Sequence, residues 1–487
     1  MPSSDAFWKA AKAAVESALP EFLLKQRWYP AKGQGGPTVR DREFFPMAGP
    51  AQSAVAAWEV SPQGGDPLLM FVPVVVVQSD AANPDQTITT LRHNGTSYAI
   101  LEAFSDDDFV RSWIGDSETP QLHRGRTNHP LQIDPATAQI RRSSVEQSNT
   151  SIRIGDQAIM KVIRKLESGP HPELEIARFL AKTGFTATPA LLGWIETIET
   201  DGRDSYALSL LQEYVPNDGD GWSWTLNRLN RAITSGDKSA LDELTKWLER
   251  LAMRTAELHR AFDAGTDDPD FRPEPVTMED FARWEKSAET MGKRAFHSME
   301  TCPALDDEGR QLSAELNKNR EAVFTRILDV KNLPRDFVRT RHHGDFHLGQ
   351  VLVAGDDAVL VDFEGEPLRP LAQRRAKHCV LRDVAGIVRS LSYAAAAVAR
   401  SLPAAKREHI ALDQWQAQAA RGFIESYFAT AQGLRSIPRD RAEAEALLDF
   451  FLLEKALYEV NYEAANRPDW IAIPLQGVLS LLRQERQ

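Results

Sequence analysis

A short segment near residue 350 carries residue types that could do chemistry. It reads RHHGDFHLGQVLVAGDDAVLVDFEGEP over residues 341–367. Within it, Asp345 and Asp362 supply carboxylates, and Gln350 supplies an amide oxygen. Oxygen atoms of these kinds bind Mg²⁺, and a carboxylate can also orient a hydroxyl group and take its proton. The segment therefore predicts phosphoryl transfer, provided that the fold brings the three side chains together.

The pattern of the same segment predicts how these side chains meet. Two β-rich runs, 351–354 and 358–361, are separated by the turn signal GDD at 355–357, which is typical of a β-hairpin. If the residues that flank this turn pair with each other, antiparallel register places Gln350 opposite Asp362. The amide and one carboxylate then lie at the open end of the hairpin, and Asp345 lies on the loop that leads into it.

The spacing also suggests a role for each residue. Protein kinases carry the pattern D-x4-N in their catalytic loop, and Asp345-x4-Gln350 reproduces it with Gln in place of Asn. We therefore expect Asp345 to act as the catalytic base, and Gln350 and Asp362 to be ligands of Mg²⁺. Asp362 takes the place of the metal-binding Asp of the kinase DFG motif.

Two other interpretations of the segment stay open. His342, His343 and His347 could indicate a zinc or iron site, but the helical spacings HxxxH and HExxH are absent and the flanking runs are strands. The loop could also be solvated and inert. Within the kinase interpretation, we expect His343 to make a structural hydrogen bond in the catalytic loop.

The nucleotide half of such a site needs a cation on a strand and an acidic partner on the next helix. Lys161 lies in the β-rich run AIMKVI, and Pro172 opens the helix that follows. Glu175 is the expected partner of Lys161, with Glu173 as the second choice. The alternative is that Lys161 is an ordinary lysine on an edge strand.

The sequence has no glycine-rich GxGxxG motif to cover the phosphates of ATP. Small polar residues fill its place and could offer backbone N–H groups and hydroxyls to phosphate: Ser148, Asn149 and Thr150. The adenine base is expected at a hinge segment after the following strand pair, where the backbone would bind it: Gln212, Glu213, Tyr214 and Val215. Asp383 is expected to cap the helix that it opens and to brace the catalytic loop.

Composition and charge restrict the class of protein. Of 487 residues, 42% are hydrophobic and 26% are charged, which is typical of a globular protein, and the net charge of −12 argues against nucleic-acid binding. The two cysteines form no CxxC pair, so a reducing cytoplasm is expected. No secretion signal is apparent, and the longest apolar run, 68–77, contains Pro73, so no membrane span is expected.

The order of patterns predicts an α+β fold in three parts. Residues 1–130 are expected to form a cap subdomain, with one helix followed by a small sheet. Residues 131–213 are expected to form a sheet with one helix. Residues 214–487 are mainly helical and contain the hairpin described above. This is the layout of a bilobal protein-kinase-like fold, with a β-rich N-lobe and a helical C-lobe.

These motifs resemble those of the bacterial maltokinases, relatives of the aminoglycoside phosphotransferases. The resemblance rests on HHGDFHLGQVL and LVDFEGEPLRPLAQRRAKHCVLRDVAGIVRSLSYA, on KQRWYPAKG near the N-terminus, on EQSNTS, and on LLEKALYEVNYEAANRPDWIAIPL. It implies ATP and Mg²⁺ as cofactors and transfer of phosphate to the anomeric hydroxyl of maltose. The product, maltose 1-phosphate, would feed α-glucan (glycogen) synthesis. An association with trehalose synthase is implied only by this pathway.

The acceptor is expected to approach Asp345 from the C-lobe. Candidates to bind it are polar and aromatic residues after the metal loop and on the last long helix: Glu364, Glu366, Arg369, Arg374, Lys455, Tyr458, Glu459 and Tyr462. The stretch RRAKHCVLRD departs from the maltokinase pattern, which leaves the sugar open. Glucosamine is the alternative acceptor, since related kinases of this architecture use it. A pseudokinase that only binds its ligand is the alternative of another class.

Overall fold

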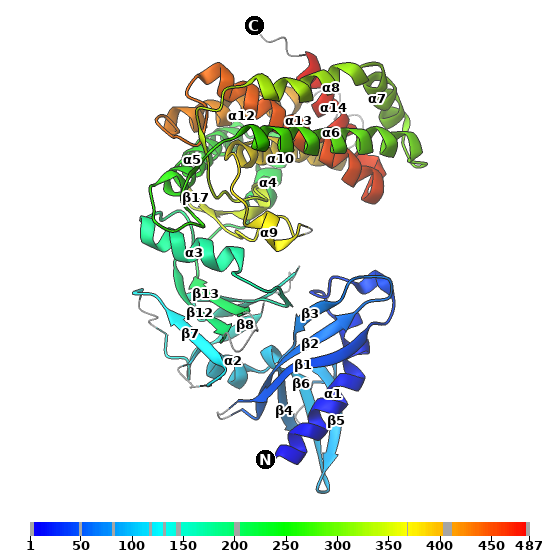
Figure 1. The fold of residues 1–487 in the computed structure, drawn as a ribbon, viewed down its shortest axis with the longest axis vertical. Helices are drawn as coiled ribbons and strands as arrows, with labels where there is room; N and C mark the ends of the chain where they lie inside the picture. Colours follow the sequence, from blue (N-terminus) through cyan, green and yellow to red (C-terminus); the bar gives the residue numbers. More distant parts are fainter. Residues whose placement is uncertain are drawn as a thin grey trace. The chain divides into compact units, whose positions relative to one another are not determined.

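The computed structural model describes most of the chain, namely residues 4–47, 51–79, 83–115, 119–129, 133–142, 148–198, 205–367, 369–402 and 412–483. The chain forms two compact units (Figure 1). The first contains Met1–Arg178 and Pro189–Val215, and the second contains Phe179–Thr188 and Pro216–Gln487.

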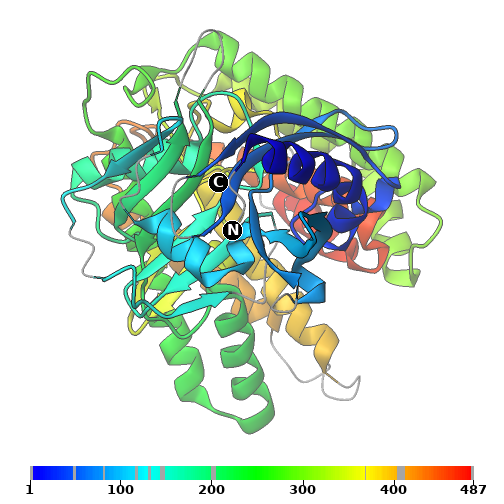
Figure 2. The ribbon, with the colours of Figure 1, turned by 90° about the horizontal axis from the view of Figure 1, so that it is seen from below.

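The first unit begins with helix α1 (Asp5–Lys25), which Ser4 caps by accepting a hydrogen bond from the backbone N–H of Phe7. Its apolar side, which includes Phe7, Val15 and Leu19, is fully buried. Figure 2 shows α1 lying across strands of the N-terminal sheet. The helix therefore forms because its apolar stripe has a sheet to cover.

The N-terminal sheet is antiparallel and has the order β11-β3-β2-β4-β6-β5, with β1 paired to β2. Its strands are β1 (Thr38–Pro46), β2 (Ser53–Ser61), β3 (Leu68–Phe71), β4 (Val74–Gln78), β5 (Thr87–His93), β6 (Thr96–Glu102) and β11 (Lys165–Leu166). Strand β2 is buried on nearly its whole length, because α1 covers one face of the sheet and a second apolar cluster covers the other.

The second sheet of this unit has the order β7-β12-β13-β10-β9-β8. Its strands are β7 (Leu122–Arg126), β8 (Ile140–Arg142), β9 (Thr150–Ile154), β10 (Ala158–Val162), β12 (Leu191–Thr197) and β13 (Ala207–Glu213). Helix α2 (Asp107–Ile114) joins it through Trp113, whose indole N–H donates to the Ser209 hydroxyl at 3.0 Å. Helix α3 (Pro172–Thr183) follows β11.

The two sheets take strands from either side of the boundary expected at residue 130. Strand β7 comes from the range predicted for the cap and pairs with β12, whereas β11 follows β10 and pairs with β3 of the N-terminal sheet. One apolar cluster contains residues of both sheets, including Phe71, Trp113 and Met160. The division into a separate cap and N-lobe stays a prediction.

The second unit is mainly helical. Its helices are α4 (Gly221–Ser235), α5 (Lys238–Asp263), α6 (Met278–Thr301), α7 (Asp307–Lys318), α8 (Arg320–Leu328), α9 (Leu371–Arg374), α10 (Leu381–Ser401), α12 (Leu412–Thr430), α13 (Arg441–Asn466) and α14 (Ala472–Arg483). Figure 1 shows α10 inside this bundle, and its contacts with α4, α12, α13 and α14 agree with that position. None of the helices in the described ranges is long and apolar enough to cross a membrane.

A short antiparallel hairpin, β16 (Val351–Ala354) and β17 (Asp357–Leu360), lies in this helical unit. Ala354 pairs with Asp357 and Val351 pairs with Leu360, so the register differs by one residue from the prediction. The turn closes with two residues, Gly355 and Asp356, because Gly355 adopts a φ of +64° that suits a tight two-residue turn. The three-residue turn predicted from GDD is therefore corrected.

Helix α10 and the catalytic loop approach each other very closely at Gly386. A Cβ atom at this position would lie well inside van der Waals contact of the backbone oxygen of Phe346. Backbone atoms cannot swing away as the end of a side chain can. Glycine is therefore required here to let the buried helix support the loop.

We expect Gly386→Ala to lower the free energy of unfolding by about 1–3 kcal/mol, because the added methyl group overpacks a backbone contact. Gly422→Ala is the matched control, since Gly422 is exposed on α12 with nothing near its Cβ direction. That control should raise stability by about 0.5–1 kcal/mol. Thermal denaturation of both variants measures the difference, and equal shifts would contradict the proposed steric cause.

Candidate active site

The catalytic loop is held by the carboxylate of Asp383. This group accepts hydrogen bonds from the backbone N–H of His343 at 2.7 Å and from that of Gly344 at 3.0 Å. It also contacts Nε2 of His259 at 3.3 Å, and Nδ1 of His259 lies 2.8 Å from the hydroxyl of Tyr427. Asp383 thus braces the loop as predicted, and a buried chain of polar groups fixes it in turn.

The predicted helix cap is corrected. Helix α10 begins at Leu381, two residues before Asp383, and its N-cap residue Val380 makes no side-chain cap. Burial alone would raise the pKa of the Asp383 carboxyl, but the hydrogen bond from His259 and the nearby histidines hold this pKa well below its ordinary value. The carboxylate is therefore ionised, and it accepts hydrogen bonds from the catalytic loop instead of capping the helix.

His343 packs inside the loop. Its ring lies 4.8 Å from that of Phe346 and 4.9 Å from that of Phe363, and Nε2 lies 3.0 Å from the backbone oxygen of Val361. Nε2 therefore carries a proton and donates it to that oxygen. This contact links the catalytic loop to the strand that leads to Asp362. The structural role predicted for His343 agrees with this geometry.

Gln350 and Asp362 meet, although the register that predicted their meeting was wrong. The amide of Gln350 donates to Oδ2 of Asp362 at 3.0 Å, and the backbone oxygen of Gln350 accepts from the N–H of Val361 at 3.0 Å. Gln350 is thus opposite residue 361 in the ladder. Asp362 reaches it because its φ is +68°, a left-handed conformation that turns the chain back.

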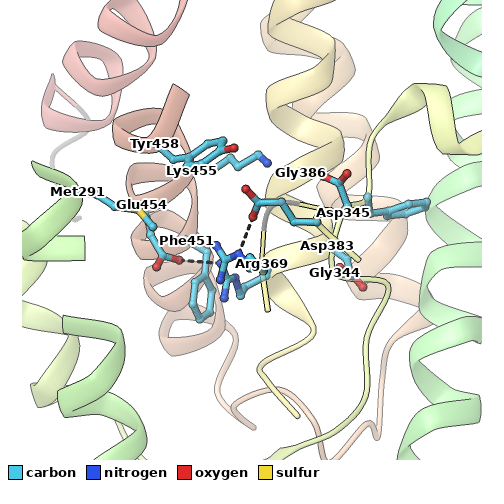
Figure 3. A pocket seen from close by; sticks show the side chains of 13 residues that line it. Met291, Gly344, Asp345, Arg369, Asp383, Gly386, Phe451, Glu454, Lys455 and Tyr458 are labelled. Atoms are coloured by element: carbon cyan, nitrogen blue, oxygen red, sulfur yellow. Dashed lines mark hydrogen bonds and ion pairs between the residues drawn. The ribbon is translucent and has the colours of Figure 1, made fainter. Parts of the chain in front are cut away.

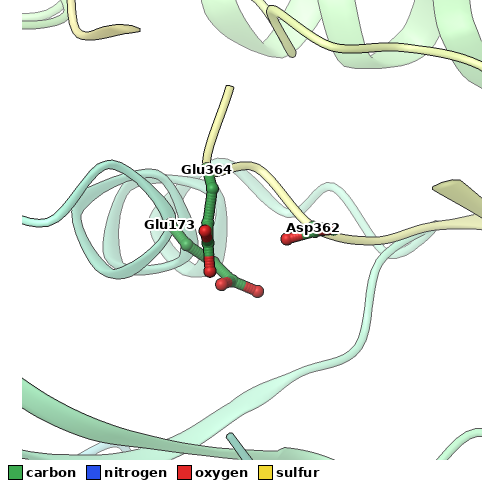
Figure 4. A group of neighbouring side chains, drawn as sticks. All are labelled: Glu173, Asp362 and Glu364. Atoms are coloured by element: carbon green, nitrogen blue, oxygen red, sulfur yellow. The ribbon is translucent and has the colours of Figure 1, made fainter. Parts of the chain in front are cut away.

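These residues offer oxygen atoms that suit Mg²⁺. Figure 4 shows Asp362 and Glu364 two residues apart on one loop, and a carboxylate oxygen of each lies within 4.8 Å of the other. The side-chain amide of Gln350 lies beside Asp362, to which its nitrogen donates, and it carries an oxygen that could also bind a metal ion. Mg²⁺ prefers oxygen ligands and usually takes one or two carboxylates from the protein. The donor set therefore fits this ion, and none of the three is a soft ligand that would favour zinc.

Lys161 has an acidic partner, but it is the residue ranked second. Its ammonium lies 2.7 Å from Oε2 of Glu173 on α3, a residue that Figure 4 also shows. The preference for Glu175 is corrected. Residues two apart on a helix are rotated by about 200°, so only one of them can face the sheet. Glu173 is buried, whereas Glu175 is half-buried.

The strand that carries Lys161 is an interior strand. β10 lies between β9 and β13, with Lys161 opposite Ser151 on one side and Leu210 on the other. The edge-strand interpretation of Lys161 is therefore wrong. The side chain is 16% exposed, so most of its stem is packed.

The small polar residues before β9 are tied down by a residue that sequence reasoning missed. The Thr150 hydroxyl accepts from Nε of Arg164 at 2.8 Å, and the Asn149 side-chain oxygen accepts from the backbone N–H of Arg164 at 3.4 Å. The Asn149 amide donates to the Ser148 hydroxyl at 3.3 Å. Arg164 is 1% exposed. Residues 146 and 147 of the predicted run lie outside the described residues.

The hinge segment offers fewer donors than expected. Gln212 is paired in the sheet. The N–H of Glu213 donates to the Ala190 oxygen, and the N–H of Tyr214 donates to the Gln157 oxygen, both at 2.8 Å. These two N–H groups are therefore not available to a base, which corrects this part of the prediction. The Tyr214 ring is covered by the Arg153 guanidinium at 3.7 Å, and the role of Val215 stays a prediction.

A pocket of the helical unit adjoins Asp345 (Figure 3). Four of the predicted acceptor residues line it, namely Glu366, Arg369, Lys455 and Tyr458. Glu366 pairs with Arg369 at 2.6 Å and also bonds the Tyr458 hydroxyl, while the Lys455 ammonium lies 5.1 Å from the centre of the Tyr458 ring. The structure thus gathers these four side chains around the expected base.

The other predicted acceptor residues do not line this pocket. Glu459 pairs with Arg389 of α10 at 2.7 Å, and Tyr462 is 42% exposed beside Arg467. Arg374 is buried and donates to the backbone oxygens of Glu364 and Arg369, and Glu364 lies on the metal loop. The face of α13 that lines the pocket lies one turn earlier than predicted, at residues 451, 454, 455 and 458.

The sequence of this chain is similar to those of known phosphotransferases. Residues 139–366 match the model of the phosphotransferase enzyme family, APH. A glucosamine kinase of Mycolicibacterium smegmatis is 30% identical over 345 residues, which cover 70% of this chain and 78% of that protein. A glucosamine kinase of Streptacidiphilus jiangxiensis is 28% identical over 346 residues, covering 69% of this chain and 72% of that protein.

The chain belongs to the APH phosphotransferase family.

Solved structures confirm the fold class that was predicted. A structure of glucosamine kinase (crystal form B) aligns with a TM-score of 0.70 at 20% identity and covers 97% of this chain and 99% of that chain. A glucosamine kinase in complex with glucosamine, ADP and inorganic phosphate aligns with a TM-score of 0.67 at 21% identity, with 96% and 98% covered. The α+β, protein-kinase-like fold of the phosphotransferase family is therefore shown for this chain.

Within this phosphotransferase, the sequence analysis did not identify several residues that line the pocket beside Asp345. Glu454 is buried and accepts from the Ser287 hydroxyl at 3.0 Å, and Arg382 lies 3.5 Å from its other oxygen. Phe451 and Met291 supply apolar surface to the same pocket. They come from α6, α10 and α13, which are distant in sequence. Only the i, i+3 and i+4 spacing from Lys455 and Tyr458 could have pointed to residues 451 and 454.

Asp383→Asn is expected to lower kcat of this phosphotransferase by about 100-fold, because a neutral amide is a poorer acceptor for the two loop N–H groups and the loop moves. Asp413→Asn, at an exposed site in the first turn of α12, is the matched control. Steady-state rates at saturating substrates provide the measurement. A folded Asp383→Asn protein with an unchanged kcat would show that the loop does not depend on this carboxylate.

The half-buried side chain of His342 predicts how stability depends on pH. Burial lowers the pKa of His342 to about 4. The unfolded chain takes up this proton below about pH 6.5, whereas the folded chain does so only near pH 4, so stability falls as the pH drops between these values. At pH 5 the loss should be about 2 kcal/mol.

Thermal unfolding at pH 7.5 and pH 5 tests this prediction. His342→Gln should reduce the fall in Tm between the two pH values, whatever it does to Tm at pH 7.5. His297→Gln is the control, because His297 is an exposed histidine on α6. An unchanged pH dependence in His342→Gln would assign the acid sensitivity to other groups.

Proposed function

We propose that this chain is an ATP-dependent sugar kinase and that its acceptor is glucosamine. Two similar proteins are glucosamine kinases, and one of the similar structures is a glucosamine kinase in complex with glucosamine, ADP and inorganic phosphate. The observation that carries the proposal is the pocket beside Asp345, which unites a half-buried carboxylate with polar residues suited to a sugar. The maltose prediction has no support from these relatives, and neither has the association with trehalose synthase.

The charges in the pocket favour an amino sugar over a neutral one. Among the described lining residues, four are carboxylates and three are cationic: Asp345, Glu366, Asp383 and Glu454 against Arg369, Arg382 and Lys455. Burial alone would raise the pKa of the Glu366 carboxyl, but Arg369, Tyr458 and Lys455 together hold this pKa below its ordinary value, so the group stays ionised. The pocket therefore carries an excess negative charge, which the ammonium group of glucosamine would neutralise.

The residues divide the chemistry as follows in this proposal. Asp345 orients the acceptor hydroxyl and receives its proton as the oxygen attacks the terminal phosphate of ATP. Gln350 and Asp362, with Glu364 beside Asp362, would hold Mg²⁺, which would supply positive charge to the phosphates when bound. Lys161, fixed by Glu173, binds phosphate oxygens. The remaining pocket residues hold the sugar so that its hydroxyl faces Asp345.

An ATP-consumption assay with Mg²⁺ tests the function over glucosamine, N-acetylglucosamine, glucose, maltose and kanamycin. We expect turnover on glucosamine and little on N-acetylglucosamine, which lacks the ammonium charge. Asp345→Asn should lower kcat by about 10²- to 10⁴-fold, as expected for removal of a general base. Asp356→Asn, exposed at the tip of the hairpin, is the control and should leave the rate unchanged.

Each other outcome has a defined meaning. Turnover on maltose alone would show that maltose, and not glucosamine, is the acceptor, as the maltokinase prediction states. If Asp345→Asn kept the wild-type turnover, Asp345 would not be the catalytic base. A protein that consumes no ATP with any acceptor, although it binds ATP, would overturn the proposal in favour of a pseudokinase.

A further inference from the structure

One buried guanidinium in the first unit contacts several separate segments of the chain. Arg164 is 1% exposed and lies in the short connection between β10, which belongs to the second sheet, and β11, which belongs to the N-terminal sheet. Its Nη1 lies 2.8 Å from Oε1 of Glu102 at the end of β6, and Nε donates to the Thr150 hydroxyl at 2.8 Å. The side chain therefore bridges the two sheets.

The backbone of Arg164 makes the same connection. Its carbonyl oxygen accepts from the N–H of Phe71 in β3 at 2.7 Å, while its N–H donates to the Asn149 side chain. The guanidinium carbon also lies 4.6 Å from the centre of the Trp28 ring, so an aromatic ring covers it. Both ends of this residue thus join the N-terminal sheet to the segment at residues 149 and 150.

The position in the sequence gives this connection a functional meaning. Arg164 follows Lys161 by three residues, and Thr150 pairs with Val162, one residue from Lys161. The segment fixed by Arg164 is therefore the one expected to cover the phosphates of ATP. Buried ion pairs add little net stability compared with apolar residues of the same size. A role in fixing a geometry accounts better for so polar a group at this place.

We propose that Arg164 is a positioning residue for ATP, which holds the segment Ser148–Thr150 in its binding conformation and is itself fixed by Glu102 of the N-terminal sheet. The N-terminal sheet would then contribute to nucleotide affinity without touching the nucleotide. This inference rests on the proposed function, because it takes residues 148–150 as part of the nucleotide site.

Arg164→Lys tests the proposal in the full chain. Lysine keeps the charge but cannot bond both Glu102 and Thr150, because it lacks the planar fork of the guanidinium. We expect KM for ATP to rise about tenfold or more, with kcat and KM for the acceptor within about twofold of wild type. Glu102→Gln should also raise KM for ATP. Circular dichroism and thermal unfolding verify that each variant is folded.

Arg178→Lys is the matched control, since the Arg178 guanidinium in this unit also pairs with a glutamate and lies over a tryptophan ring. Its guanidinium lies 2.6 Å from Glu196 and 4.0 Å from the centre of the Trp194 ring. This variant should keep the wild-type KM for ATP. A purely structural role for Arg164 would predict similar losses of stability in both variants and no selective change in KM for ATP, and that result would overturn the proposal.

A double variant separates the positioning effect from a general disturbance. If Arg164 acts through the Thr150 hydroxyl, adding Thr150→Val to Arg164→Lys should raise KM for ATP no further than the larger single effect. If the double variant instead raised KM for ATP by the product of the two single effects, Arg164 would not act through the Thr150 hydroxyl. Titration with Mg²⁺ and a non-hydrolysable ATP analogue gives the same comparison without any acceptor, so weaker binding in Arg164→Lys would support the inference even if no sugar proved to be a substrate.

Discussion

The candidate site depends on one carboxylate, that of Asp383. It holds two successive N–H groups of the catalytic loop, at His343 and Gly344, and so sets the direction in which the next residue, Asp345, leaves the loop. An ionised carboxylate is a strong acceptor, and burial makes each of these bonds more costly to break. His259 donates a hydrogen bond to this buried carboxylate, and it is fully buried itself.

The rest of the helical unit follows from supporting this carboxylate. Helix α10 presents Asp383 near its start and Gly386 one turn later, where the helix must nearly touch the loop backbone. Helix α13 then supplies Glu454, Lys455 and Tyr458 to the space beside Asp345. The pocket beside Asp345 is thus a consequence of packing two long helices against a loop that the carboxylate of Asp383 holds in place.

The first unit uses a comparable device, in which Lys161 is held on an interior strand by Glu173 and the neighbouring polar segment is held by Arg164. Both units therefore place reactive groups by pairing buried charges. Isolated buried charges would be unfavourable, so each needs its partner for the fold to be stable. This explains why the proposed substrate-binding residues and the residues proposed to position them lie so close together.

The local sequence was sufficient to predict the fold class, a hairpin in this segment and the contact between Gln350 and Asp362, because strand and turn patterns act over a few residues. The catalytic and metal-binding roles of Asp345, Gln350 and Asp362 stay predictions. Tertiary structure decided everything that depends on which face of a helix is buried or on a single dihedral angle. It paired Lys161 with Glu173 instead of Glu175, and it joined Gln350 to Asp362 through a left-handed backbone in spite of a shifted register. It also gathered Arg164, Glu102 and Thr150 from distant segments, since only packing brings such residues within hydrogen-bond distance.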